Sequence, residues 1–209
     1  MIKKPKFIEE LNENISFNEE IKSTDTIQNA FIKNDFIEDI DSTGVDMDSC
    51  IVKNTVFSNC AFKNISLLDV KFENCDLSNI DFSCGGLKRV EFINCKLLGS
   101  KFMECSLTDV KFKDCTCKYS SVAFSKLKSV IIENCNFSEG NFQDAKLDKV
   151  EFTNTELVNT YFNNTPLDKI DLTTCDIRGI NVDIKDVSGV TVTSMQAIEL
   201  TKLLNINIK

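Results

Sequence analysis

Every fifth residue of this chain is apolar from Phe57 to Val182, and the spacing is never interrupted. A period of five belongs neither to an α-helix, which repeats every 3.6 residues, nor to a simple strand, which repeats every two. A fixed internal period of this kind indicates a repeat architecture. The series consists of Phe57, Phe62, Leu67, Phe72, Leu77, Phe82, Leu87, Phe92, Leu97, Phe102, Leu107, Phe112, Cys117, Val122, Leu127, Ile132, Phe137, Phe142, Leu147, Phe152, Leu157, Phe162, Leu167, Leu172, Ile177 and Val182.

A second inward position lies two residues before each member of this series. It holds small or β-branched residues, beginning with Cys60, Ile65 and Val70. The other three positions of each five are mostly charged or polar, so two side chains face inward and three face outward. This alternation predicts a short strand followed by a corner.

Blocks such as Cys95-Lys96-Leu97-Leu98-Gly99 and Val110-Lys111-Phe112-Lys113-Asp114 resemble the pentapeptide-repeat family, and the resemblance extends over about residues 45–184. It implies an all-β fold, a right-handed quadrilateral β-helix with four pentapeptides per coil and about seven to eight coils. The sequence supports the four-fold count independently, because residue types recur every twenty positions. Phe62, Phe82 and Phe102 share one wall, and Leu67, Leu87 and Leu107 share the next. We name the four walls after the inward residues Phe62, Leu67, Phe72 and Leu77.

The chain of 209 residues contains no histidine and has a net charge of −8. Without histidine, the usual general base and most nucleophilic triads are missing, and no imidazole can complete a zinc site. Acidic residues fall on outward repeat positions, where solvation explains them. We therefore predict a protein that is not an enzyme, with no catalytic residue, no cofactor and no metal site.

Cysteines are frequent, yet their positions do not suggest a disulfide framework. Eight of the ten, at positions 50, 60, 75, 95, 105, 115, 135 and 175, occupy the small inward position, where cysteine acts as a small hydrophobe. No apolar run reaches the eighteen residues of a transmembrane helix, and the N-terminus leads into Phe7-Ile8-Glu9-Glu10 rather than an apolar signal stretch. We expect a cytoplasmic protein that is not bound to a membrane.

The two ends differ from the repeats, which predicts three regions. Residues 1–26 are expected to form an N-terminal cap, 27–184 the β-helix, and 185–209 a C-terminal helix cap and dimerisation tail. Phe31 and Phe36 lie one residue out of register, so we expect an imperfect first coil with one extra residue near positions 41–44. Ser194 is the predicted N-cap of a helix over 195–204, and 205–209 are expected to form a short strand.

This tail is similar to those of quinolone-resistance-type pentapeptide proteins, and the loopless members of that group are the appropriate comparison because the repeat phase is unbroken. The similarity implies a two-fold homodimer. The apolar residues expected at its interface are Leu200, Leu203, Leu204, Ile206 and Ile208.

Two functions remain open from the sequence. One is a protein-interaction scaffold with an unidentified partner; the other, implied by the resemblance, is a DNA-mimicking modulator of DNA gyrase. Residues 45–184 carry 16 basic and 20 acidic side chains, no wall is strongly acidic, and the Leu67 wall is basic, which argues against mimicry there. The longest acidic track lies on the Phe72 wall and consists of Glu73, Glu91, Asp114, Glu133, Glu151 and Asp171. We do not expect direct nucleic-acid binding, because the basic face lacks interleaved aromatic residues.

One group of outward residues is a candidate partner patch: Met103, Tyr119, Ala123 and Phe124. The alternative is a local bulge that turns Phe124 inward, because Cys117 and Val122 are undersized for their inward positions. A separate ladder of amides at one corner, beginning with Asn54, Asn74 and Asn94, is expected to stabilise the turns through hydrogen bonds.

Overall fold

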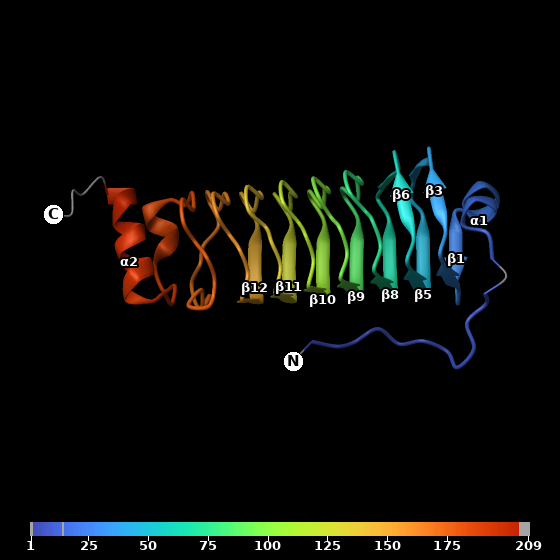
Figure 1. The fold of residues 1–209 in the computed structure, drawn as a ribbon, viewed down its shortest axis with the longest axis horizontal. Helices are drawn as coiled ribbons and strands as arrows, with labels where there is room; N and C mark the ends of the chain where they lie inside the picture. Colours follow the sequence, from blue (N-terminus) through green and yellow to red (C-terminus); the bar gives the residue numbers. More distant parts are fainter. Residues whose placement is uncertain (1, 14, 205–209) are drawn as a thin grey trace.

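The computed structural model describes residues 2–13 and 15–204, which form an elongated rod of stacked coils (Figure 1). The helices are α1 (Phe17–Thr24) and α2 (Ser194–Thr201), with 3-10 turns η1 (Ile184–Val187) and η2 (Lys202–Leu204). The first strands are short: β1 (Thr26–Gln28), β2 (Phe31–Lys33), β3 (Phe36–Glu38), β4 (Asp41–Thr43), β6 (Val56–Ser58) and β7 (Ala61–Lys63). The longer strands are β5 (Asp46–Lys53), β8 (Ser66–Glu73), β9 (Gly86–Ile93), β10 (Ser106–Lys113), β11 (Lys126–Glu133) and β12 (Lys146–Thr153).

Each strand pairs in parallel with a segment twenty residues away in the chain. Leu67 lies opposite Leu87, and Phe92 opposite Phe112, in the sheet that runs β1-β5-β8-β9-β10-β11-β12. Six turns separate Thr26 in β1 from Lys146 in β12, and isolated bridges carry the same register on to Thr191. The predicted right-handed quadrilateral β-helix with four pentapeptides per coil is confirmed.

Aromatic rings stack along the interior of the rod because the inward series repeats from coil to coil. Phe92 lies between Phe72 and Phe112, with ring centroids 5.1 and 4.9 Å away, and Phe102 meets it edge-on at 5.8 Å. Phe92 has no exposed surface. Burying one Phe side chain stabilises the fold by about 1.5–3 kcal/mol, so this column is a major source of stability.

The first coil keeps the repeat phase, which corrects our expectation of an extra residue near positions 41–44. Ile32 and Ile37 are the inward residues of β2 and β3, whereas Phe36 is 57 % exposed. Phe36 pairs with Val56, and Ile37 with Phe57, in unbroken register. The larger aromatic residues suggested a shifted phase, but the neighbouring isoleucines fill the interior.

Almost every coil turns its corners through a residue with positive φ, and many of these residues are Asn or Asp. Asn and Asp tolerate this left-handed conformation better than other side chains. The predicted amide ladder is confirmed: Asn54, Asn74 and Asn94 each donate a side-chain hydrogen bond to the residue twenty positions earlier, at 2.8–3.1 Å. Asn134 donates in the same way to Asp114 at 3.0 Å. Asp114 has no side-chain N–H, so it cannot donate to Asn94 and the ladder is divided there.

Side chains at the small inward positions donate hydrogen bonds to backbone carbonyls as well as filling space. The thiol of Cys75 donates to the carbonyl of Val52 at 3.4 Å, and the hydroxyl of Ser100 donates to that of Leu77 at 2.8 Å, both 23 residues earlier. Nine of the ten free cysteines are buried, and Cys84 is exposed. Burial raises the pKa of the Cys50 thiol to about 11. The Cys50 thiol therefore stays protonated near neutral pH and acts as a structural group.

Helix α1 covers the first coil of the rod. Its buried Phe17 meets Phe57 and Phe62 edge-on, with centroids 5.5 and 5.8 Å away. Before α1, residues 2–8 are extended and turn back along the rod (Figure 1).

Helix α2 covers the last coil, and its N-cap is Thr193 rather than the predicted Ser194. The Thr193 hydroxyl accepts from the Gln196 amide, and the Gln196 side chain accepts from the Thr193 amide, which completes a capping box. The Gln196 amide group also donates to the carbonyls of Leu172 and Cys175 at 2.7 and 2.8 Å. Neither helix in the described residues is long and apolar enough to span a bilayer.

Candidate protein-interaction surfaces

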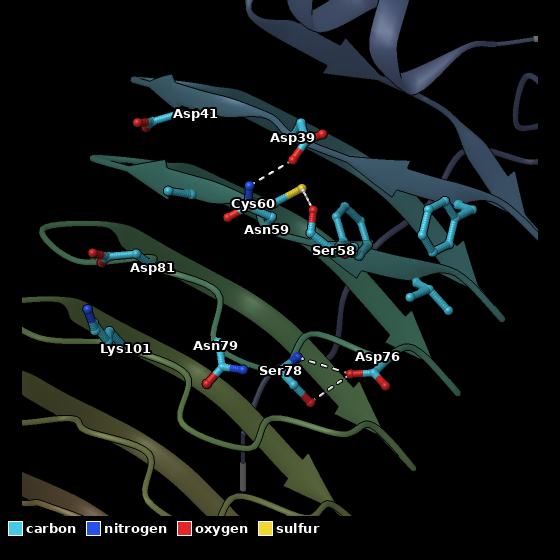
Figure 2. A pocket seen from close by; sticks show the side chains of 14 residues that line it. Asp39, Asp41, Ser58, Asn59, Cys60, Asp76, Ser78, Asn79, Asp81 and Lys101 are labelled. Carbon is cyan, nitrogen blue, oxygen red and sulfur yellow. Dashed lines mark hydrogen bonds between the residues drawn. The ribbon is translucent and has the colours of Figure 1, made fainter.

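One groove of the rod lies at the corner between the Leu77 and Phe62 walls, across the first coils (Figure 2). It has a volume of about 810 Å³. Four carboxylates line it: Asp39, Asp41, Asp76 and Asp81. Lys101 stands at one end, while the exposed Phe36 and Val56 form an apolar rim. We call this the acidic groove.

The acidic groove is built by turn chemistry. Asp76 accepts hydrogen bonds from the amide and hydroxyl of Ser78, at 3.1 and 2.7 Å, and Asp39 accepts from the side chain of Asn59 at 2.7 Å (Figure 2). Such bonds fix the carboxylates in place without neutralising them. Burial raises the pKa of Asp81, but bonds from Ser83 and the charges of Lys101 and Lys63 together hold it below its ordinary value. Lys96 lies 3.5 Å from Asp76 and Lys63 lies 3.9 Å from Asp81, so the exposed Asp39 and Asp41 contribute most of the uncompensated negative charge of the groove.

Sequence reasoning missed this groove for a physical reason. Asp39 and Asp41 belong to the first coil, whose phase we had shifted by one residue. In the correct phase Asp41 and Asp81 share one column, with Ala61 between them. The alternation of Asp, Ala and Asp at twenty-residue spacing was the available signal.

The predicted acidic track on the Phe72 wall is interrupted by lysines. Glu73 lies 2.6 Å from both Lys53 and Lys71, and hydrogen bonds from the two ammonium groups hold its pKa below the ordinary value. Glu133 is paired in the same way with Lys111 at 2.6 Å and Lys113 at 3.2 Å.

Among the other members of the track, Glu91, Glu151 and Asp171 belong to one column of that wall, in which Lys71, Lys111 and Ile131 also lie. Glu91 stands between Lys71 and Lys111 in its column, Asp114 is at the corner, and Glu151 and Asp171 are exposed on later coils. The six residues therefore do not form one continuous negative surface.

The predicted partner patch is divided by the Phe62 wall. Tyr119 and Phe124 are each 52 % exposed, and they occupy corners at opposite edges of this wall. Met103 is half-buried and Ala123 is buried, so neither offers much surface. The alternative in which Phe124 turns inward is wrong, because Phe124 keeps a corner φ of 61° and points to solvent.

Both tyrosines of the chain line a second groove, of about 420 Å³, on the C-terminal half of the rod. Tyr119, Tyr161 and Glu139 are among its lining residues. The ammonium of Lys118 lies 5.1 Å from the centre of the Tyr119 ring and 3.6 Å from Glu139. Sequence reasoning identified Tyr119 but not Tyr161. Tyr161 lies two coils further along the rod and just past the corner that Tyr119 occupies.

The predicted dimer contacts are divided between the interior and the surface. Leu200 and Leu203 pack partly buried against the core of their own chain, whereas Leu204 is 50 % exposed. Ile206 and Ile208 lie outside the described residues. Met195 and Ile198, which the sequence analysis did not single out, are 75 and 49 % exposed on the outer side of α2.

Family profiles match the repeats directly. The profile for the pentapeptide repeat region matches residues 65–134, and the profile for pentapeptide repeats (8 copies) matches 135–173, so the two together cover just over half of the chain. The chain belongs to the pentapeptide-repeat family. No curated protein sequence matches it.

Solved structures of other pentapeptide-repeat proteins share this fold. A trypsin-treated form of QnrB1, a plasmid-mediated fluoroquinolone resistance protein, is 20 % identical with a TM-score of 0.53, and the match covers 88 % of this chain and 98 % of QnrB1. HetL, involved in heterocyst differentiation regulation in the cyanobacterium Nostoc, is 13 % identical with a TM-score of 0.44, covering 79 % of this chain and 86 % of HetL. At these identities the similarity concerns the fold alone.

Within residues 2–13 and 15–204, no cluster of three or more Cys, Asp or Glu side chains could hold a metal ion. The acidic groove combines four carboxylates with an exposed apolar rim of Phe36 and Val56.

Proposed function

We propose that this pentapeptide-repeat protein is a non-enzymatic scaffold that binds a partner protein through the acidic groove. The observation that supports this is the grouping of Asp39, Asp41, Asp76 and Asp81 beside exposed Phe36 and Val56. The exposed charges of Asp39 and Asp41 speed encounter with a positive partner, and an adjacent apolar rim supplies buried area on contact. The expected partner presents lysine or arginine around an apolar side chain.

The experiment is photo-crosslinking from the groove in extract of the native host. A photoreactive residue at Val56 should capture one protein, and the same residue at Thr153, exposed on the Phe72 wall, is the control. The variant Asp39→Asn, Asp41→Asn, Asp76→Asn, Asp81→Asn removes four charges while keeping an oxygen that accepts the turn hydrogen bonds. We expect this variant and raised salt to abolish capture, because screening weakens exposed charge pairs. Unchanged capture by the neutral variant would contradict the proposal.

A second candidate is a DNA-mimicking modulator of DNA gyrase. Its support is the net charge of −8, the acidic groove, and the shared fold with the fluoroquinolone resistance protein QnrB1. The lysine pairing of Glu73 and Glu133 argues against the Phe72 wall as the mimicking face. We therefore assign any such activity to the acidic groove.

A supercoiling assay tests this second candidate. Gyrase from a related host is measured with and without a quinolone, at micromolar concentrations of the wild-type and of the four-fold Asn variant. Inhibition or protection by the wild-type protein alone would support the gyrase role. No effect of the wild-type protein would eliminate it and leave the scaffold proposal unaffected.

We further propose that two chains associate through the C-terminal end and that the protein works in the cytoplasm. Exposed Met195, Ile198 and Leu204 support the first proposal, since two-fold dimers are the commonest homo-oligomers. Ten free cysteines support a reducing compartment.

A further inference from the structure

The N-terminal arm, residues 2–8, contacts the Leu67 wall through two backbone amides. The Lys6 amide donates to Oδ1 of Asp69 at 2.9 Å, and the Lys3 amide donates to Oδ1 of Asp109 at 3.1 Å. Figure 1 shows the arm turning back from α1 and running along the rod, across the direction of the strands. A segment remote from the repeats in the sequence thus crosses three of their coils.

The two acceptors differ from all comparable residues. Among the described non-glycine residues with positive φ, Asp69 and Asp109 alone are buried, at 5 and 9 % exposure. Between them lies Arg89, whose Nε donates to Asp69 at 2.6 Å and whose second nitrogen also contacts that carboxylate. Buried carboxylates need hydrogen-bond donors, and the arm supplies one to each.

The spacing of the acceptors suits any extended chain. Asp69 and Asp109 are two coils apart, which is about 9.6 Å at the usual strand separation, and three extended residues span about 10 Å. Every third amide of an extended chain can therefore reach every second coil. These contacts use backbone atoms, so they do not depend on the side chains of Lys3 and Lys6.

Charge selects the kind of chain that this wall holds. The coils of the Leu67 wall from Asp46 to Asp109 carry four Asp against Lys88 and Arg89, while the coils beyond them are rich in lysine. The arm places Lys3, Lys4 and Lys6 on the acidic half. Burial raises the pKa of Asp69, but the bonds from Arg89 and the Lys6 amide, with the charges of both residues, hold it below its ordinary value.

We propose that Asp69, Arg89 and Asp109 form a binding track for an extended, lysine-rich segment of a partner protein, and that the arm, residues 2–8, occupies this track until the partner displaces it. The arm competes with an effective concentration in the millimolar range, because it is attached to the same chain. A partner segment therefore binds only when its own affinity or its local concentration overcomes the arm. The track is separate from the acidic groove, so its test is independent of the proposed scaffold function.

Fluorescence anisotropy with a labelled peptide of residues 2–8 tests the proposal on the full chain. The variant Lys3→Pro, Lys6→Pro removes both donors while favouring an extended backbone, and Lys4→Pro is the matched control. We expect the peptide to bind the double variant at least about tenfold more tightly than it binds the wild-type or the Lys4→Pro protein, because the competing arm is released. Equal binding to all three proteins would overturn the proposal.

Two further variants locate the binding. Adding Asp109→Ala to the double variant should remove peptide binding, whereas adding Asp148→Ala, which changes an exposed carboxylate further along the same wall, should not. Hydrogen exchange of the repeat coils verifies that each variant is folded. Binding that persists in Asp109→Ala would place the peptide elsewhere and overturn the track. Asp109-dependent dimers of the wild-type protein in light scattering would also contradict it, because the occupant would then be the arm of a second copy.

Discussion

The two ends of the rod are closed by different means. At the first coil, Phe17 of α1 is buried against two phenylalanine rings, and the outward side of this helix carries Glu19 and Lys22. At the last coil, α2 has no fully buried residue, and Met195 and Ile198 face solvent. The N-terminal end is closed by aromatic packing beneath a polar surface, whereas the C-terminal end retains an exposed apolar surface.

This difference separates two needs of any solenoid end. An open coil exposes both apolar side chains and unpaired backbone groups. Helix α1 meets the first need by inserting a ring into the core. Helix α2 meets the second through Gln196, which bonds two carbonyls of the preceding coil. The apolar surface that remains on α2 is where we expect a second chain.

The largest loss of stability should come from removing a phenylalanine ring that is enclosed on both sides. This loss is the reference for the substitutions at the two ends. Phe92→Ala removes a ring stacked between Phe72 and Phe112 and should cost about 3–5 kcal/mol in denaturant unfolding. The exposed Phe36 is the matched control, and Phe36→Ala should change stability by less than about 0.5 kcal/mol. A loss below about 1 kcal/mol for Phe92→Ala would show that the stacking does not stabilise the rod.

Phe17→Ala tests the packed end. The ring is buried but has the core on one side only, so the loss should lie near the lower limit for Phe→Ala, about 3 kcal/mol. Lys22→Ala, on the exposed last turn of α1, is the control and should be nearly neutral. Equal effects of the two changes in chemical unfolding would mean that α1 does not close the rod by packing.

Gln196→Ala tests the hydrogen-bonded end. It leaves two carbonyls without their donor and breaks the capping box, at a cost of about 1–3 kcal/mol. Gln28→Ala, at an exposed position in β1, provides the comparison. Hydrogen exchange should show the loss in α2 and the last coil, with the middle coils unchanged. If Gln196→Ala were neutral, packing of Leu200 and Leu203 would have to account for the closure.

Substitution of the exposed apolar residues of α2 should change stability least but should change the oligomeric state. Met195→Ser with Ile198→Ser alters exposed side chains, so the folding of each chain should change by less than about 0.5 kcal/mol. Light scattering should show a wild-type dimer and a variant monomer, while Leu98→Ser, at a similarly exposed site on the Leu77 wall, stays dimeric. A wild-type monomer at micromolar concentration would refute the predicted dimer.

The repeats were predictable because each inward position is repeated many times under the same packing demand. The first coil was not, because Phe31 and Ile32, and again Phe36 and Ile37, are adjacent apolar residues that permit two phases. Pairing with β5 and β6 selects the phase that keeps Ile32 and Ile37 inside. Pairing with neighbouring coils therefore selects one of the two phases that the local hydrophobic pattern permits.

The candidate surfaces were less predictable than the core. Pairing of Glu73 and Glu133 with lysines depends on which outward rows lie side by side, and a count of charges on a wall does not include it. The contacts of Lys3 and Lys6 use backbone amides, so they leave no pattern in the side chains. Exposed residues also lack the repeated packing requirement that made the inward series recognisable in the sequence.

The divided amide ladder has a consequence for how the rod assembles. Each finished coil presents a side-chain oxygen and a row of carbonyls that set the register of the next coil, so order can spread from one coil to its neighbour. Between Asn94 and Asp114 this guidance is missing at one corner, because two acceptors face each other. We expect pulsed hydrogen exchange during refolding to show the coils on either side of this corner gaining protection as two separate groups; simultaneous protection would show that the backbone ladder alone carries order across the gap.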